Sequence, residues 1–261
     1  MRVVSLVPSL TEAVAVTAPG VLVGATDWCS HPADLDVVRI GGTKNPDVAA
    51  ITALRPDLVI ANEEENRAPD LAALRAAGLD VLVTEIRTLD QALRELERVL
   101  AACGAPRPRW LDEAEAAWES VARLGQRAAG ESVAPPGQEA AGKSGAPLGP
   151  VTAVVPIWRR PWMVVGRDTF AGDLLARLGV RNLYADHPER YPRVPLDELR
   201  ASAPDLVVLP DEPYRFTRDD GPEAFPGTPA ALVDGRMLTW YGPSLAEAPR
   251  ALARALRAAR R

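Results

Sequence analysis

Short apolar runs alternate with amphipathic segments along the first third of the chain. Residues 3–7, 21–25 and 81–84 are apolar runs of strand length, and each is separated from the next by a segment with helical spacing of its apolar residues. Strands that alternate with helices predict parallel sheets with both faces covered. The pattern is therefore typical of an α/β protein.

The tetrapeptide Pro-Asp-Leu-Val occurs twice in the same setting, beginning at Pro56 and at Pro204. Each copy follows a short amphipathic helix and precedes an apolar strand. Because the residue before a proline is pushed out of the helical region, each helix is expected to end there. Two matching helix–strand units predict one lobe built twice, with a cleft between the halves in which a ligand binds.

From Leu89 the alternation gives way to helices alone. Apolar residues between Leu89 and Leu100 fall on one helical face, and a second helix is predicted from about Pro108 to Ala129. No strand separates the two, so this stretch predicts a rigid helix that crosses from one lobe to the other. Residues 131–150 are rich in Gly, Pro, Ala and Ser, which predicts a disordered loop.

A second α/β lobe is predicted after this loop. Strands are expected at 152–156, 163–165, 182–184 and 237–239, with a helix that starts at Asp168-Thr169 and a terminal helix from Leu245 to Arg260. The predicted organisation is an N-terminal lobe (1–88), a helical linker (89–130), a disordered insertion (131–150) and a C-terminal lobe (151–261). The fold class is two Rossmann-like lobes with parallel sheets, joined by a long backbone helix.

Composition narrows the classes of function. A net charge of −5 over 261 residues argues against nucleic acid as a partner, since that needs a basic surface. No run approaches 20 uninterrupted apolar residues, so no membrane insertion is expected. Residues 1–12 lack the apolar core and cleavage site of an export signal, which predicts a cytoplasmic protein, or an extracytoplasmic one if a signal was omitted.

The 13 aromatic residues (Trp 6, Tyr 4, Phe 3) are placed unevenly. Many of them sit in or just after predicted strand ends: Trp28, Trp158, Trp162, Tyr214, Phe216, Trp240 and Tyr241. In open parallel sheets, ligands bind beyond the carboxyl ends of the strands, where exposed rings offer flat contact area. The alternative is that each ring plugs a junction between loops and helices. Taken together, the rings favour a large ligand.

Charged residues accompany the rings. Arg159, Arg160 and Arg167 flank Trp158 and Trp162, and they fit either an anionic edge of a ligand or a solvated loop paired with Asp168, Asp211 or Glu212. The acidic runs Glu63–Glu65 and Asp211–Glu212 follow the two repeat strands. They are expected to cap the next helices or to line the edge of the cleft.

Signatures of catalysis and of metal binding are missing from the sequence. There is no GxGxxG after a strand, no P-loop and no GxSxG elbow, so a non-catalytic protein is expected. An enzyme that uses Glu64 or Glu212 on a cofactor is the rival from another class. Cys29 and Cys103 have no CxxC spacing, and the only histidines, His31 and His187, are read as loop residues rather than as a shared metal site.

Several strings of residues in order resemble the helical-backbone substrate-binding proteins of ABC transporters, in particular the cobalamin-binding branch. They are residues 2–12, 23–28, 42–46, 54–59, 64–67, 158–166, 212–214 and 238–243. The resemblance implies a corrinoid such as cobalamin held by aromatic rings in the cleft, with no covalent cofactor. A haem or an iron–siderophore met by the three arginines is the alternative ligand, and a cytosolic corrinoid-binding relative without a transporter is the alternative setting.

The aromatic pattern and the resemblance together predict the ligand-binding residues Trp28, Asn62, Glu64, Asn66, Trp158, Arg159, Trp162, Tyr191, Tyr214, Trp240 and Tyr241. The resemblance places Tyr191 and Trp240 on the lobe opposite Trp28. It also implies a monomer that docks onto an ABC permease through one acidic residue per lobe. Asp197 keeps the charge in the second lobe, whereas Ala49 has lost it in the first, with Asp47 as the nearest substitute.

Overall fold

The computed structural model describes residues 1–130 and 151–260, and its contacts divide the chain into two compact units. Unit 1 comprises Met1–Ile86, Asp90–Asp112 and Trp240–Pro243. Unit 2 comprises Arg87–Leu89, Glu113–Thr239 and Ser244–Arg261. The predicted disordered insertion, 131–150, lies outside the described residues.

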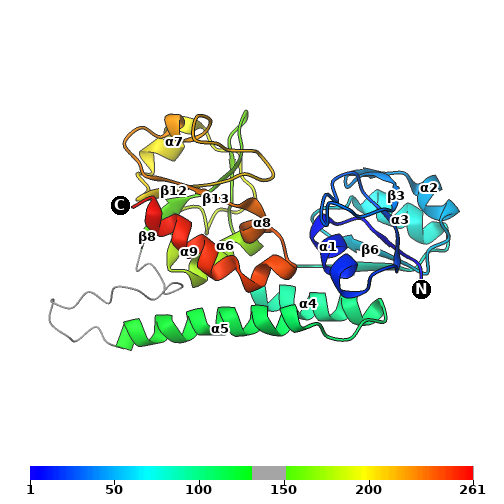
Figure 1. Cartoon of the computed structure of the whole chain (residues 1–261). Coiled ribbons are helices and arrows are strands. Elements are labelled where there is room, and N and C mark those ends of the chain that lie inside the picture. The colour runs from blue at the N-terminus through cyan, green and yellow to red at the C-terminus, as the bar shows by residue number, and fades with distance from the viewer. Residues whose placement is uncertain (131–150, 261) are drawn as a thin grey trace. The chain divides into compact units, whose positions relative to one another are not determined.

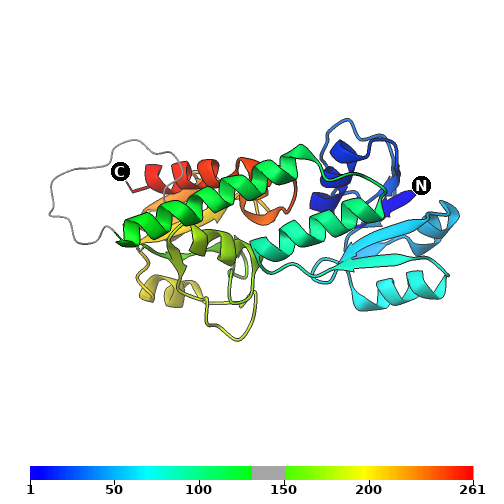
Figure 2. The ribbon, with the colours of Figure 1, turned by 90° about the horizontal axis from the view of Figure 1, so that it is seen from below.

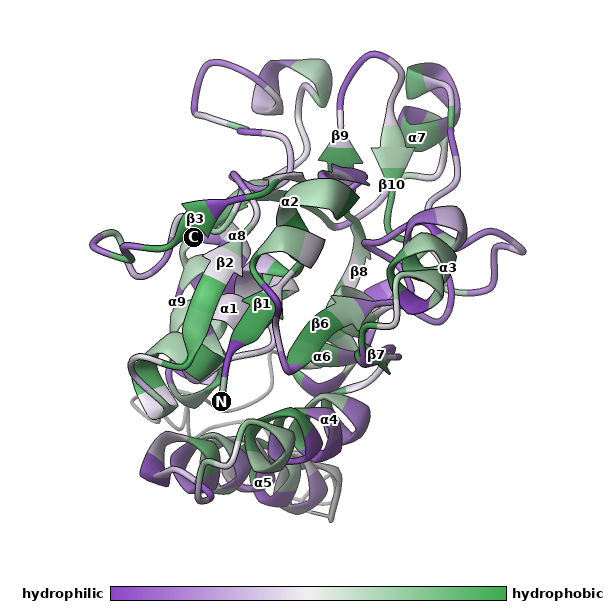
Figure 3. Cartoon of the chain, turned by 90° about the vertical axis from the view of Figure 1, so that its right-hand side faces the viewer, coloured by the Kyte–Doolittle hydropathy of each residue, from purple (hydrophilic) through white to green (hydrophobic). Residues whose placement is uncertain are grey.

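Unit 1 is built on a parallel five-stranded sheet (Figures 1 and 3). Its strands, in the order β3-β2-β1-β6-β7, are Val38–Arg39, Leu22–Ala25, Val3–Ser5, Leu58–Asn62 and Val81–Thr84. The helices α1 (Pro8–Thr17), α2 (Val48–Ala53) and α3 (Ala68–Ala76) pack around it, and β4 (Gly41–Gly42) pairs with β5 (Asn45–Pro46) in a small hairpin. Because β1 and β6 are buried along their whole length, their sequences are continuous apolar runs with a polar residue only at the carboxyl end.

Unit 2 repeats this plan with a parallel four-stranded sheet. In the order β11-β8-β12-β13, its strands are Val180–Asn182, Val151–Val154, Leu206–Pro210 and Ala230–Val233. An antiparallel hairpin, β9 (Pro156–Trp158) and β10 (Met163–Val164), extends from the carboxyl end of β8. The helices are α6 (Phe170–Arg177), α7 (Leu196–Ala201), α8 (Gly235–Thr239) and α9 (Ala248–Ala258), with 3-10 turns at Pro222–Ala224 and Pro243–Ala246 (Figure 1).

One predicted strand is wrong, and several short strands were not predicted, among them the edge strand β13 (Ala230–Val233). Residues 237–239 belong to α8, and the edge strand β13 lies just before them. A short apolar run has no periodicity that separates a strand from a buried helical turn. Polar contacts favour the helix here, since the Asp211 carboxylate accepts a hydrogen bond from the Gly235 amide at 2.6 Å and the Asp234 carboxylate accepts one from the Arg236 amide at 2.9 Å.

The repeated tetrapeptide has the same structure in both units. Both α2 and α7 end before the proline as predicted, and the residue directly before the proline takes a left-handed conformation, with φ 45° at Arg55 and 46° at Ala203. The aspartate that follows fastens the start of the neighbouring strand. Asp57 accepts from the Arg2 amide at 2.6 Å, and Asp205 accepts from the Thr152 amide at 2.8 Å.

Two consecutive helices, α4 (Leu89–Ala102) and α5 (Arg109–Gly130), form the predicted linker. Figure 2 shows α5 as one continuous helix, and its 22 residues make it about 33 Å long. It begins in unit 1 and belongs to unit 2 from Glu113 onward. The indole of Trp110 donates to the Thr17 hydroxyl in unit 1 at 3.0 Å, and that of Trp118 donates to the Leu245 carbonyl in unit 2 at 3.1 Å. The predicted fold class, two α/β lobes with parallel sheets joined by a long helix, is confirmed.

Within the described residues, no helix combines the length and the apolar character needed to cross a membrane.

Candidate functional site

The strand order of each sheet marks where a ligand is expected. In unit 1 the chain runs from β1 outward to β2 and β3, then returns to the other side of β1 with β6. In unit 2 it moves from β8 to β11 and returns with β12. Ligands of open α/β sheets bind outside the carboxyl ends of the strands at such a reversal. The residues that follow β1, β2 and β6, and those that follow β8 and β12, are therefore the candidates.

The unit 1 cluster, as we call it, consists of Trp28, His31, Glu65, Trp240 and Tyr241. Trp28 follows β2 and is 69% exposed, which is unusual for so large an apolar side chain. The Trp240 ring meets the His31 ring edge-on, with 5.4 Å between centroids, and the Tyr241 hydroxyl donates to the Glu65 carboxyl at 3.1 Å. Trp240 and Tyr241, which the sequence placed in the C-terminal lobe, thus lie in unit 1.

The indole of Trp28 lies over Gly42 in the small hairpin. A Cβ atom at Gly42 would come within 3.6 Å of the Trp28 indole nitrogen and 2.6 Å of the Asn45 side-chain oxygen. A larger residue at position 42 would displace the side chain of Asn45. Glycine therefore leaves room for the tryptophan to lie on the backbone of the hairpin.

Asn62 and Asn66 lie at the same edge but are buried. The Asn62 amide donates to the Thr84 carbonyl at 3.2 Å and hydroxyl at 3.0 Å, and its oxygen accepts from the Glu64 amide at 2.9 Å. The Asn66 side chain accepts from the Asn62 amide and donates to the carbonyls of Leu6 and Thr43. These bonds hold the loop that carries Glu64 and Glu65.

The carboxyl of Glu65 is in an unusual electrostatic environment. Burial raises its pKa to about 7, and the hydrogen bond from Tyr241 opposes this rise without cancelling it. Glu64 raises the pKa further, whereas Lys44, whose ammonium donates to the Glu64 carbonyl at 2.6 Å, lowers it. Burial together with the nearby acids also raises the pKa of Tyr241 well above its ordinary value. Near neutral pH the cluster therefore contains a carboxyl that exchanges its proton.

The unit 2 cluster consists of Trp158, Arg159, Trp162, Tyr214 and Phe216, on the β9–β10 hairpin and the loop after β12. Trp158 is 43% exposed and meets Tyr214 edge-on at 5.7 Å, while Trp162 stacks on Phe216 at 6.0 Å. Tyr214 and Phe216 are also in contact, with 4.7 Å between ring centroids. The exposed ring of Trp158 is therefore the outer member of a packed aromatic group.

Arg159 does not have a free charge in this cluster. Its guanidinium lies 5.3 Å from the centre of the Trp162 ring and forms ion pairs with Asp220 and, at 2.6 Å, with Glu223. The Tyr214 hydroxyl donates to the other oxygen of Asp220 at 2.6 Å, which lowers the pKa of that carboxyl. Arg159 is thus paired with carboxylates, as one of the two alternatives from the sequence expected. Its partners are not the expected Asp168, Asp211 or Glu212, because folding brings Asp220 and Glu223 close to it.

The remaining arginines of this group differ from one another. Arg167 pairs with its neighbour Asp168 at 3.0 Å, which is one of the two arrangements expected from the sequence. Arg160 is exposed at the tip of the hairpin, with φ 67°.

The other predicted residues are Tyr191 and two aspartates at exposed helix starts. Tyr191 is half-buried beside β10, where the Arg190 guanidinium lies 5.9 Å from the centre of its ring. Asp47 is exposed and caps α2 by accepting from the Ala50 amide at 2.9 Å. Asp197 has a side chain 96% exposed in the first turn of α7, within 3.5 Å of Arg200. Both aspartates are thus available on the surface of their units.

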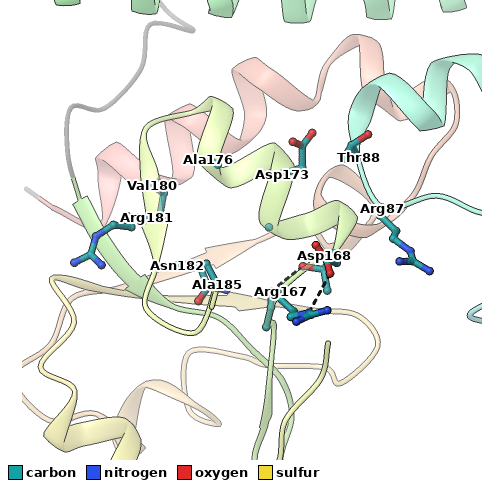
Figure 4. A pocket seen from close by; sticks show the side chains of 13 residues that line it. Arg87, Thr88, Arg167, Asp168, Asp173, Ala176, Val180, Arg181, Asn182 and Ala185 are labelled. Atoms are coloured by element: carbon teal, nitrogen blue, oxygen red, sulfur yellow. Dashed lines mark hydrogen bonds and ion pairs between the residues drawn. The ribbon is translucent and has the colours of Figure 1, made fainter. Parts of the chain in front are cut away.

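Unit 2 also contains a cavity of about 310 Å³ along α6 and β11 (Figure 4). Its charged lining includes Arg87, Arg167, Asp168, Asp173 and Arg181, of which Arg167 and Asp168 form an ion pair. None of the predicted ligand-binding residues lines this cavity.

Metal-ligating residues do not gather in the described part of the chain. No group of three or more His, Cys, Asp or Glu side chains has the geometry of a metal site there. His187 accepts from the Glu189 amide at 3.0 Å within its own loop. Cys29 and Cys103 are buried free thiols.

Glu65, Asp220 and Glu223 are residues that the sequence analysis did not single out. In the sequence, Glu65 is one of three consecutive glutamates and nothing distinguishes it from the other two. Its hydrogen bond with Tyr241 comes from a residue 176 positions later in the chain. No local signal links Asp220 and Glu223 to Arg159, more than 60 positions earlier in the chain.

Comparison with known proteins gives one family. The model of the family described as "Periplasmic binding protein" matches residues 3–231. Among curated proteins, the chain is 25% identical over 211 residues to a vitamin B12-binding protein of Photorhabdus laumondii, covering 80% of this chain and 70% of that protein. A vitamin B12-binding protein of Vibrio cholerae is 22% identical over 208 residues, with 79% of this chain and 69% of that protein covered.

Solved structures agree on the fold. The periplasmic heme-binding protein RhuT from Roseiflexus sp. RS-1 in apo form superimposes with a TM-score of 0.78 at 22% identity, covering 100% of this chain and 99% of that one. The periplasmic vitamin B12 binding protein BtuF of Vibrio cholerae superimposes with a TM-score of 0.71 at 16% identity, covering 100% and 98%. At these identities the likeness establishes the fold and leaves the ligand open.

The comparisons correct one expectation. A cytoplasmic location was predicted from the first residues of the chain, and it is wrong, because the matched family and both superimposed structures are periplasmic binding proteins, which work outside the cytoplasm.

Proposed function

Because the chain belongs to the periplasmic binding protein family, we propose that it is a non-catalytic substrate-binding protein for ABC-type uptake, and that its ligand is cobalamin or a related corrinoid. Proteins of this family bind small molecules and work with ABC permeases. The observation that carries the proposal is the placement of exposed tryptophans, Trp28 and Trp158, at the carboxyl strand ends of both units. Such rings suit a large ligand with flat, apolar faces.

The choice of a corrinoid over a haem or an iron–siderophore depends on the arginines. A haem or siderophore was expected to place its carboxylates on Arg159, Arg160 and Arg167. Arg159 is already paired with Asp220 and Glu223, and Arg167 is paired with Asp168. Breaking such pairs to bind another anion replaces one ion pair by another and gains little free energy. The curated relatives, which are vitamin B12-binding proteins, favour the same ligand.

Docking on a permease is proposed through Asp47 and Asp197. Both carboxylates are exposed in the first turn of corresponding helices, or just before it. Ala49 occupies the position in α2 that corresponds to Asp197 in α7, so Asp47 would carry the charge of unit 1 from a place two residues earlier.

Titration calorimetry with cyanocobalamin, and with hemin in parallel, tests the ligand. We expect cyanocobalamin to bind and Trp28→Ala to weaken it by about 1–3 kcal/mol, or roughly fivefold to 150-fold, as for a buried ring at an interface. Trp28→Phe, which keeps a ring, should lose less, and Val38→Ala, which truncates another exposed apolar residue of unit 1, should lose nothing. Binding of hemin alone would assign the other chelate class, and binding of neither would reject the proposal.

A further inference from the structure

The segment Trp240–Pro243 lies in unit 1, although the residues on both sides of it belong to unit 2. Within unit 1 it is held by side chains rather than by a sheet. The Glu65 carboxyl accepts from Tyr241 at 3.1 Å, and His31 packs edge-on against Trp240 at 5.4 Å. Gly242 lies so close to α1 that a Cβ there would be 3.3 Å from the Ser9 carbonyl oxygen. Glu65 therefore anchors the segment that carries two of the predicted ligand-binding rings.

Charged and titratable groups face Glu65 from several elements. Glu64 is its neighbour on the loop after β6, Lys44 comes from the β4–β5 turn, and Cys29 comes from the loop after β2. Tyr241 faces it from the anchored segment, while His31, from the loop after β2, packs against Trp240, and Glu12 of α1 lies 4.0 Å from the place of a Cβ on Gly242. Glu64 raises the pKa of Glu65 more than Lys44 lowers it, so a proton on Glu65 relieves the repulsion from Glu64.

We propose that Glu65 is a positioning residue that holds Tyr241, and with it Trp240, and that its proton couples ligand capture to pH, because binding of an uncharged chelate takes up protons there. This inference depends on the proposed function, because it concerns the same site. It goes further by assigning a regulating group that touches the anchored segment.

The direction of the effect follows from solvation. A neutral ligand that covers the unit 1 cluster removes further water from Glu65, and loss of water disfavours the charged carboxylate. The bound state then holds more protons than the free state, so affinity must increase as the pH falls. Burial has already raised the pKa of Glu65 to about 7 in the free protein. A further rise of about one unit on binding would make the dissociation constant at pH 8 about fivefold larger than at pH 6.

The test is calorimetric titration of the full chain with cyanocobalamin at pH 6, 7 and 8, in buffers of different ionisation enthalpy so that protons taken up are counted. The wild type should take up about half a proton near neutral pH and lose about fivefold in affinity from pH 6 to pH 8. Glu65→Gln should be independent of pH and bind as the wild type does at pH 6. Tyr241→Phe removes a bond that favours the ionised form, so its pH dependence should move to higher pH.

Two matched variants separate this role from others. Glu64→Gln changes the adjacent acid on the same loop and should keep the proton uptake, moved to lower pH because Glu64 raises the pKa of Glu65. His31→Gln changes the ring beside Trp240 and should keep the proton uptake. Binding without proton uptake, or uptake that persists in Glu65→Gln, would overturn the inference while leaving the proposed function intact. Failure of the wild type to bind at any pH would instead reject the proposed function.

Discussion

The asparagine at the end of β6 offers the sharpest prediction about how the site is held. Asn62 makes four side-chain hydrogen bonds, to the Thr84 carbonyl and hydroxyl and from the amides of Glu64 and Glu65, at 2.9–3.3 Å. In Asn62→Ala the Thr84 carbonyl keeps the bond from the Glu63 amide, and the Thr84 hydroxyl keeps its bond to the Ala61 carbonyl. The loss therefore falls on the amides of Glu64 and Glu65.

Two lost bonds to partly buried amides correspond to about 2 kcal/mol of local stability. Amide hydrogen exchange at Glu64 and Glu65 should accelerate by about 30-fold, since each 1.4 kcal/mol is a factor of ten. The measurement is native-state exchange followed residue by residue. Because the same loop carries Glu65, the variant should also release Tyr241 from its hydrogen bond.

Asn182 provides a matched control in unit 2. It ends β11, donates to the Val165 carbonyl at 2.7 Å and accepts from the Tyr184 amide at 3.1 Å. Asn182→Ala should accelerate exchange at Tyr184 and leave Glu64 and Glu65 unchanged. Equal exchange at Glu64 and Glu65 in wild type and Asn62→Ala would show that the asparagine does not hold the acidic loop, and the reasoning would be refuted.

Two further predictions concern the charged groups of the clusters. Since the pKa of Glu65 is raised from 4.5 to about 7, the folded protein holds this proton more tightly than the unfolded chain does. The contribution of Glu65 to the free energy of unfolding is therefore complete below pH 4.5 and falls by about 3 kcal/mol as the pH rises to 7 and above. Glu65→Gln should abolish this loss when urea unfolding is compared at pH 5 and pH 8. Arg159→Met removes the ion pairs with Asp220 and Glu223, so the lowered pKa of each carboxyl should return toward its ordinary value in an NMR titration, whereas Arg160→Met should move these values much less.

The local pattern was enough to predict most of the fold. Alternating apolar and amphipathic segments specify parallel sheets covered by helices, and the repeated Pro-Asp-Leu-Val marks the same helix end and strand start in both units. The helix predicted from about Pro108 to Ala129 is observed as Arg109–Gly130. The strand β13 was missed and the strand at 237–239 was wrongly predicted, because short apolar runs are compatible with either a strand or a helical turn.

The site was predictable in kind but not in detail. The aromatic residues after the strands could be named, since parallel strands bring their carboxyl ends to one edge. Whether a polar residue among them contacts a ligand or supports the loop depends on burial, and burial separates Asn62 and Asn66 from Trp28. The ligand-contacting role of each of these residues stays a prediction.

The amino-acid sequence by itself determined the two-lobed α/β architecture, the linking helices and the concentration of rings at strand ends, because these follow from periodicity and from turn-forming residues within a few positions of one another. Only the tertiary structure decided that Trp240 and Tyr241 join unit 1, that Arg159 is already neutralised, and that burial raises the pKa of Glu65. Those outcomes depend on which distant residues exclude water and supply charge at a given point, and no local pattern carries that information.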